Sequence, residues 1–131
     1  MRLLLDTHVA LWAVADVGKL SEPAKRLISD EANEIFVSAA SLWEIAIKRA
    51  LAGQRIGRMP VTAATALDCF GQAGYRLLDI SASHAVAVET LPAHHADPFD
   101  RILIAQALAE PMRLLTADAK MPVYGDVVIR I

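Results

Sequence analysis

Short apolar runs that lead into an acidic residue recur along this chain and alternate with segments of helical periodicity. The first run is three leucines, and Asp6 closes it, as expected for a buried strand of a parallel sheet. Asp118 follows a later run of the same kind, while Glu44 and Asp100 fall in the first turns of predicted helices. Because parallel strands bring their carboxyl ends to one edge of an open α/β sheet, we expect the four acids to converge there.

The alternation predicts a three-layer α/β/α sandwich around a mostly parallel sheet of four or five strands. Strands are expected at residues 3–5, 34–37, 76–80, 114–116 and 127–131. Helices are expected over residues 7–15, from Ser21 onward, from Ser38 or Ser41 to residue 51, over residues 62–72, from Ser81 or Ser83 onward, and from Asp97 onward. Residues 53–60 carry glycines, arginines and a proline, which predicts a loop.

Length and composition predict one domain over residues 1–131. The chain is 55% hydrophobic, with a mean hydropathy of +0.38, but charges interrupt every apolar stretch before the roughly 18 residues that a membrane span needs. We therefore read the apolar surplus as core plus a surface suited to self-association. Met1 and Arg2 lead directly into a strand without the pattern of a secretory signal, so we expect a cytoplasmic protein.

Positive charge that could favour a nucleic-acid partner is found only in local clusters of the sequence. The net charge of −2 gives no global basic field. Positive residues nevertheless flank two of the acids: Lys48, Arg49, Arg55, Arg58 and Arg101. These residues either contact a phosphate backbone or form a solvated face, and Arg101 either anchors a phosphate or pairs with Asp97 at the surface.

Each acid has an ordinary explanation when it is taken alone. Asp6 could cap the helix that follows it, and Asp118 could cap a turn. Glu44 stands three residues after Ser41 in the spacing of a capping box, and Asp100 could favour the helix dipole. Gathered at one sheet edge, however, the four carboxylates would repel one another unless a cation sat among them.

Carboxylate oxygens are the ligands of hard cations such as Mg²⁺ or Mn²⁺. Such an ion makes its bound water acidic enough to attack a phosphodiester, and it offsets charge on the phosphate oxygens. The sequence leaves open whether one or two ions bind.

Other residue patterns carry weaker signals. His94 and His95 beside Asp97 could suggest a zinc or other transition-metal site, yet they precede a helix in a loop and have no cysteine nearby. Trp12 and Trp43 could stack on bases, but both lie on apolar helical faces, which favours core packing. The single cysteine, Cys69, falls within a predicted helix and reads as a small buried hydrophobe.

The motifs together resemble one family, the PIN domain, and within it the VapC toxins of bacterial toxin–antitoxin pairs. The likeness runs through LLLDTH (residues 3–8), VSAASLWEI (37–45), HHADPFDR (94–101), LIAQA (103–107) and LTAD (115–118). These segments cover nearly the entire chain in the family's order, which makes the resemblance specific. His8 stands where many PIN domains carry a smaller polar residue.

The resemblance implies a Mg²⁺-dependent endoribonuclease, with Mn²⁺ as a substitute, whose acidic quartet supplies both the catalytic groups and the metal ligands. The quartet is Asp6, Glu44, Asp100 and Asp118. Thr7 and Thr116 would be supporting polar residues of the pocket. Asp97 would be either an outer acid of the site or a helix cap alone.

The resemblance also implies partners. Lys48, Arg49 and Arg101 are the candidate RNA contacts. The family implies a homodimer and a cognate VapB-type antitoxin, which embraces the toxin and pushes an arginine into the acidic pocket. The RNA target and cleavage sequence are not readable, because the loops that select RNA follow no simple code.

Two rivals belong to other functional classes. A haloacid-dehalogenase-like phosphatase also begins with an aspartate at a strand end, but it needs a second aspartate two positions later, where this chain has His8. A catalytically inactive PIN-like module would bind RNA or protein without cutting. Retention of all four acids argues against that module, because a dead site has no reason to bear their repulsion.

Overall fold

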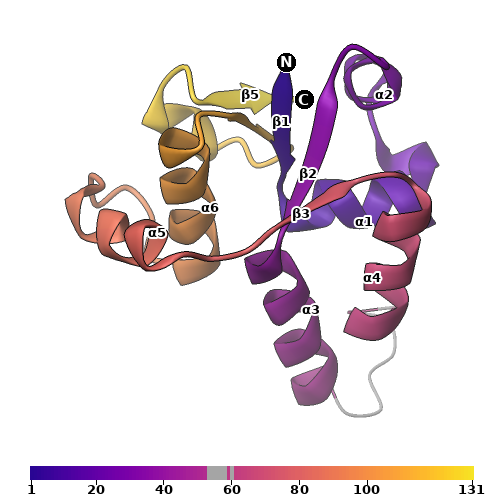
Figure 1. Cartoon of the computed structure of the whole chain (residues 1–131), viewed down its shortest axis with the longest axis horizontal. Helices are drawn as coiled ribbons and strands as arrows, with labels where there is room; N and C mark the ends of the chain where they lie inside the picture. The colour runs from indigo at the N-terminus through magenta and orange to yellow at the C-terminus, as the bar shows by residue number, and fades with distance from the viewer. Residues whose placement is uncertain (53–58, 60) are drawn as a thin grey trace.

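The computed structural model describes residues 1–52, 59 and 61–131, and within this part of the chain it forms a five-stranded sheet (Figure 1). The strands are β1 (Arg2–Leu5), β2 (Glu34–Ser38), β3 (Arg76–Leu78), β4 (Arg113–Thr116) and β5 (Val128–Arg130). The helices are α1 (Thr7–Ala15), α2 (Glu22–Ser29), α3 (Ala39–Ala52), α4 (Ala63–Gln72), α5 (Ala82–Ala87) and α6 (Pro98–Ala109), with 3₁₀ turns η1 (Val17–Lys19), η2 (Val88–Thr90) and η3 (Met121–Tyr124).

All strand pairs in the sheet are parallel, in the order β3-β2-β1-β4-β5. β1 is central, and its last residue Leu5 lies opposite Val37 of β2 and Leu115 of β4. The strands on either side of β1 therefore end within a residue or two of Asp6. This register confirms the predicted sandwich, and it brings segments from both halves of the chain to one edge.

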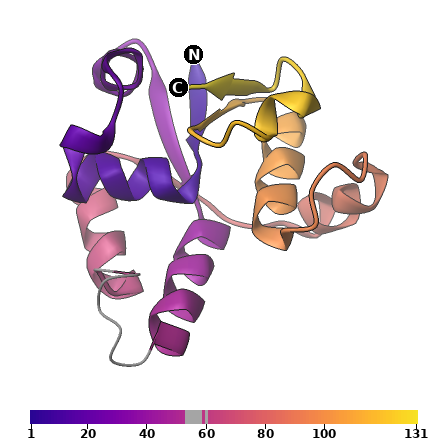
Figure 2. The ribbon, with the colours of Figure 1, turned by 180° about the vertical axis from the view of Figure 1, so that it is seen from behind.

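Alternating side chains of β1 build two separate cores, one on each face of the sheet. Leu3 and Leu5 belong to a cluster with residues of α1, α2, α3 and α4, whereas Leu4 packs with residues of α6. All three leucines are fully buried, as a strand covered on both faces requires. Figures 1 and 2 show the same arrangement from opposite sides, with α6 on one side of the sheet and α1 and α4 on the other.

Most predicted helix starts are confirmed by their capping contacts. The Ser21 side chain accepts from Ala24 N at the start of α2, and Ser81 forms a reciprocal capping box with His84 at the start of α5. Asp97 accepts from Phe99 N, and proline occupies the first position of α6.

Some predicted boundaries are wrong. α3 begins at Ala39, which confirms Ser38 rather than Ser41 as its predicted start, and Ser38 Oγ accepts from Ala40 N at 3.0 Å. Ser41 lies inside the helix, so the Ser41–Glu44 capping box does not form. α5 ends before Val88, which begins a 3₁₀ turn. β3 stops at Leu78, two residues earlier than predicted, because edge strands have pairing on one side only.

The predicted loop at residues 53–60 lies outside the described residues, apart from Met59, and so do Arg55 and Arg58. Among the described helices, none combines the length and hydropathy needed to cross a lipid bilayer.

Candidate functional site

A pocket of about 340 Å³ lies at the carboxyl edge of the sheet. All four predicted acids line it, and the full lining is Asp6, His8, Trp12, Glu44, Lys48, Asp97, Asp100, Ala117 and Asp118. These residues come from α1, α3, α6 and the segments that follow β1 and β4. The predicted convergence of the acids is therefore a feature of the structure.

Asp6 accepts a hydrogen bond on each of its carboxylate oxygens. Its Oδ1 accepts from Thr7 N at 2.7 Å, and its Oδ2 accepts from Thr116 Oγ1 at 2.6 Å. The side chain is buried, with 9% of the residue exposed. Burial raises the pKa of Asp6, and the charge of Glu44 adds to this, while the two hydrogen bonds and nearby His8 oppose it.

Glu44 reaches the pocket from the second turn of α3. Thr7 Oγ1 donates to Glu44 Oε1 at 2.8 Å and lies 2.9 Å from Ser41 Oγ, and Lys48 Nζ lies 2.5 Å from Glu44 Oε2. Burial would lower the pKa of Lys48, but the hydrogen bond and charge of Glu44, with further charge from Asp97 and Asp100, raise it. Lys48 thus stays protonated and offsets part of the negative charge of the pocket.

Asp100 stands in the first turn of α6 and bears the largest penalty for ionisation. Burial, together with the charges of Asp6, Asp97, Asp118 and Glu44, raises its pKa from 3.8 to about 7. Asp97 contributes in two ways, because it caps α6 through Phe99 N and also lines the pocket. Such repulsion is relieved by a cation among the carboxylates.

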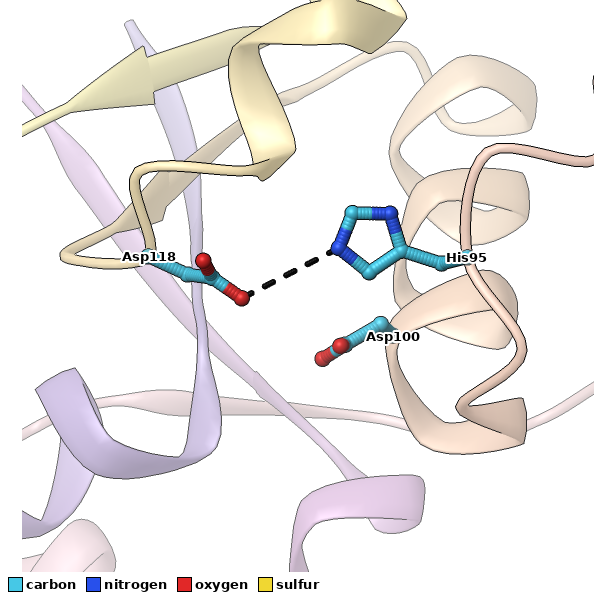
Figure 3. Close-up of side chains that lie close together, drawn as sticks. All are labelled: His95, Asp100 and Asp118. Carbon is cyan, nitrogen blue, oxygen red and sulfur yellow. Dashed lines mark ion pairs between the residues drawn. The ribbon is translucent and has the colours of Figure 1, made fainter.

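Asp118 lies at the more open side of the pocket, with 38% of its side chain exposed. Its backbone N donates to Thr116 Oγ1 at 3.0 Å, so the same threonine holds both Asp6 and the segment carrying Asp118. Figure 3 shows Asp118 and Asp100 turned toward each other, with His95 beside them. His95 Nε2 is 3.9 Å from Asp118 Oδ2.

The three candidate RNA contacts differ in what already holds them. Lys48 lines the pocket and pairs with Glu44. Arg49 Nη1 donates to Met59 O at 2.7 Å, away from the acids. Arg101 Nη1 and Nη2 donate to Pro92 O and Val88 O, each at 3.0 Å.

Arg101 therefore fixes backbone ahead of α6. Within the described residues it forms no ion pair with Asp97, so that predicted surface pair is absent.

The predicted core packing is wrong for Trp43 and is confirmed in part for Trp12, which packs against the core cluster from a partly buried position. Trp43 is 57% exposed and meets Phe99 edge to face, with ring centroids 5.2 Å apart. Trp12 is partly buried and lines the acidic pocket together with His8, whose ring centroid is 6.0 Å away. In α1 and α3, residues of the core and residues beside the pocket follow the same apolar periodicity. The periodicity therefore could not distinguish the two positions.

A larger cavity of about 680 Å³ opens at the other end of the sheet, beside the first residues of β2 and β3. Two of its basic residues are paired locally: Lys25 with Glu22 at 3.1 Å and Arg76 with Glu34 at 3.4 Å. Its lining has no group of converging carboxylates among the described residues. The acidic pocket is therefore the stronger candidate for chemistry.

The donor chemistry of the acidic pocket fits a divalent cation. It offers several carboxylate oxygens. Among the described residues, its basic lining residues are Lys48 and His8. Hard divalent ions take carboxylate oxygens as ligands. A cation would also relieve the repulsion that raises the pKa of Asp100.

Comparison with known proteins finds one family over most of the chain. The model of the PIN domain family matches residues 3–127. Ribonuclease VapC22 of Mycobacterium tuberculosis (strain ATCC 25618 / H37Rv) is 32% identical over 120 residues, which is 91% of this chain and 88% of that protein.

Solved structures share the fold at low sequence identity. VapBC2 from Rickettsia felis, bound to a DNA fragment from its promoter, matches with a TM-score of 0.69 and 18% identity, over 100% of this chain and 98% of that one. A toxin–antitoxin complex from Klebsiella pneumoniae matches with a TM-score of 0.57 and 20% identity, over 98% and 99%. FitAcB from Neisseria gonorrhoeae matches with a TM-score of 0.60 and 16% identity, over 98% and 96%.

Proposed function

The chain belongs to the PIN domain family, and from this premise we propose that it is a VapC-type ribonuclease, the toxin of a toxin–antitoxin pair. We further propose that cleavage depends on a divalent ion, Mg²⁺ or in its place Mn²⁺. The observation that carries the proposal is the meeting of four acids from four separate segments in one pocket. The alternative, an inactive PIN-like binding module, has no need of so repulsive a cluster.

The proposed ligands are Asp6, Glu44, Asp100 and Asp118. An ion held there would supply an activated water for attack on an RNA phosphodiester and would offset charge on the phosphate oxygens. The side chains around the pocket would hold the carboxylates in the orientation that the ion and the RNA require.

Asp6 is the anchor of the proposed site, because both of its oxygens are fixed by donors from Thr7 and Thr116. Glu44 is oriented by Thr7 on one oxygen and by Lys48 on the other. Asp118 has the most exposed position, where RNA would enter. Lys48 is the best placed of the basic residues to meet a phosphate, since it lines the pocket and keeps 44% of its side chain exposed.

We also propose the partners that this class of toxin implies: a VapB-type antitoxin and a second copy of the chain. Large apolar side chains are exposed on α5 and α6, with Val86 at 68% and Leu108 at 54%, which supports association. Co-expression with the product of an adjacent short reading frame, followed by measurement of the mass of the complex in solution, tests both partners.

The cleavage experiment uses metal-free full-length protein and a mixed pool of single-stranded and folded RNA. Reactions receive Mg²⁺, Mn²⁺ or chelator, and the matched variants are Asp6→Asn in the pocket and Asp16→Asn on the surface. We expect metal-dependent fragments from wild type and Asp16→Asn, and a rate lower by at least about a hundredfold for Asp6→Asn. RNA binding without any metal-dependent fragments would instead favour the binding module.

A further inference from the structure

His95 is buried beside the acidic pocket without a hydrogen-bond partner. Its side chain is 9% exposed, and neither ring nitrogen has a partner within the described residues. Buried polar groups are normally paired, since leaving one unpaired forfeits its hydration without compensation. An imidazole in this position therefore indicates a ligand that the described part of the chain does not supply.

The ring is aimed at two of the acids. His95 Nε2 lies 3.9 Å from Asp118 Oδ2, too far for a hydrogen bond, and one ligand atom each from His95, Asp100 and Asp118 lies within 4.8 Å of the others. Figure 3 shows the imidazole facing Asp118, with Asp100 alongside. Ligands of one ion with bonds of about 2.1 Å stand about 3 to 4.2 Å apart, so small side-chain rotations would bring all three onto a shared ion.

The surrounding contacts hold His95 in this place. Arg101 donates to Pro92 O and also lies 3.4 Å from His95 O, so its guanidinium fixes the loop before α6 at two points. The ring of Tyr124 packs against the imidazole, with centroids 5.6 Å apart. Such support around a ligand sets its orientation before any ion arrives.

We propose that His95 is a nitrogen ligand of the divalent ion in this pocket, which it shares with Asp100 and Asp118. The inference deepens the proposed ribonuclease function, because it adds a ligand to the same site and predicts which ion the site prefers. Imidazole nitrogen suits Mn²⁺ and later transition metals better than Mg²⁺, which favours oxygen. The site should therefore prefer Mn²⁺ over Mg²⁺ more strongly than four carboxylates alone would.

The test is spectroscopic and needs no RNA. Metal-free full-length protein is loaded with Mn²⁺, and pulsed electron paramagnetic resonance detects ¹⁴N coupled to the ion. We expect coupling in wild type and its loss in His95→Asn, together with about tenfold weaker Mn²⁺ binding and a smaller change for Mg²⁺ in competition titrations. His94→Asn is the matched control, because its ring packs on the same Tyr124 but is absent from the three-residue cluster.

A second control is needed because His8 also lines the pocket. His8→Asn should keep the ¹⁴N coupling, and this result, together with the wild-type spectrum, tests the assignment even if His95→Asn fails to fold. Bound Mn²⁺ without nitrogen coupling in wild type, or coupling that disappears in His8→Asn, would overturn the inference while metal-dependent RNA cleavage persisted. Nitrogen-coupled Mn²⁺ in a protein that cuts no RNA would instead refute the proposed ribonuclease function and support the assignment of His95 as a metal ligand.

Discussion

Thr116 Oγ1 donates a hydrogen bond to Asp6 Oδ2 across 2.6 Å, although 110 positions separate the two residues. The contact exists because β4 pairs with β1 in parallel, which puts both strand ends at the same edge. Thr116 also accepts from Asp118 N. One hydroxyl therefore couples the orientation of two of the proposed ligands.

Replacing Thr116 with valine tests this coupling with almost no change of shape. Thr116→Val leaves Asp6 Oδ2 and Asp118 N without their partner, so both carboxylates lose orientation. We expect metal affinity, measured by calorimetry, and the RNA cleavage rate to fall about 10- to 100-fold. Thr116→Ser keeps the hydroxyl and should stay near wild type; equal losses in both variants would show that packing of the methyl group matters instead.

The metal-free protein should lose stability as the pH rises from about 4 to about 7. The pKa of Asp100 is about 7 in the folded chain, against an ordinary value of 3.8, so the folded state binds more protons than the unfolded state in this window. The contribution of protonated Asp100 to the free energy of unfolding is fully present below about pH 4 and is lost as the pH rises through about 7. Urea unfolding at several pH values in chelator measures the slope, and Asp100→Asn should flatten it.

Added divalent metal should reverse that loss at pH 8, because it binds the ionised carboxylates of the folded protein. At a metal concentration of about 100 times Kd, linkage predicts about 2.7 kcal/mol of added stability. The thermal midpoint with metal and then with excess chelator gives the measurement. A midpoint that responds equally in wild type and Asp100→Asn would mean that the stabilising ion binds elsewhere.

Lys48 should weaken metal binding while it helps RNA binding. Its ammonium group lies 2.5 Å from Glu44 Oε2 and adds positive charge where the ion is proposed to bind. Lys48→Met should therefore tighten Mn²⁺ binding by about fivefold, given the screened strength of charge pairs near a surface, and should weaken binding of single-stranded RNA.

The control for this prediction is Arg49→Met, since Arg49 donates to Met59 O and forms no ion pair with Glu44 among the described residues. It removes the same unit of charge from the neighbouring position. Metal affinity that shifts equally in both variants would reflect net charge rather than the Lys48–Glu44 contact.

Trp43 should contribute little to stability, although it is a large aromatic residue. It is 57% exposed, and the edge-to-face contact that it makes with Phe99 is worth about 0.5–1.5 kcal/mol. Trp43→Ala should lower the free energy of unfolding by no more than about 1.5 kcal/mol in urea titrations. Fully buried Phe70 is the comparison, and Phe70→Ala should cost about 3–5 kcal/mol.

The sequence by itself determined the strand–helix alternation, the fold class and the acids of the pocket. These depend on local signals: a run of leucines makes a buried strand, and a parallel strand must deliver its following residue to the ligand edge. Helix caps such as Asp97 and Ser81 are local in the same sense, because their partners are two or three residues away.

Only the tertiary structure decided which side chains meet across that edge. The Ser41–Glu44 capping box was wrong because α3 starts directly after β2, and Glu44 is held instead by Thr7 and Lys48. Trp43 is exposed although its apolar helix face favoured core packing, since helix periodicity does not say which neighbour covers a face. The position of His95 depends likewise on a tertiary contact, because Arg101 holds the loop before α6. The Thr7–Glu44 and Trp43–Phe99 contacts join residues far apart in the chain, so they depend on how the sheet and helices pack and leave no local signal in the sequence.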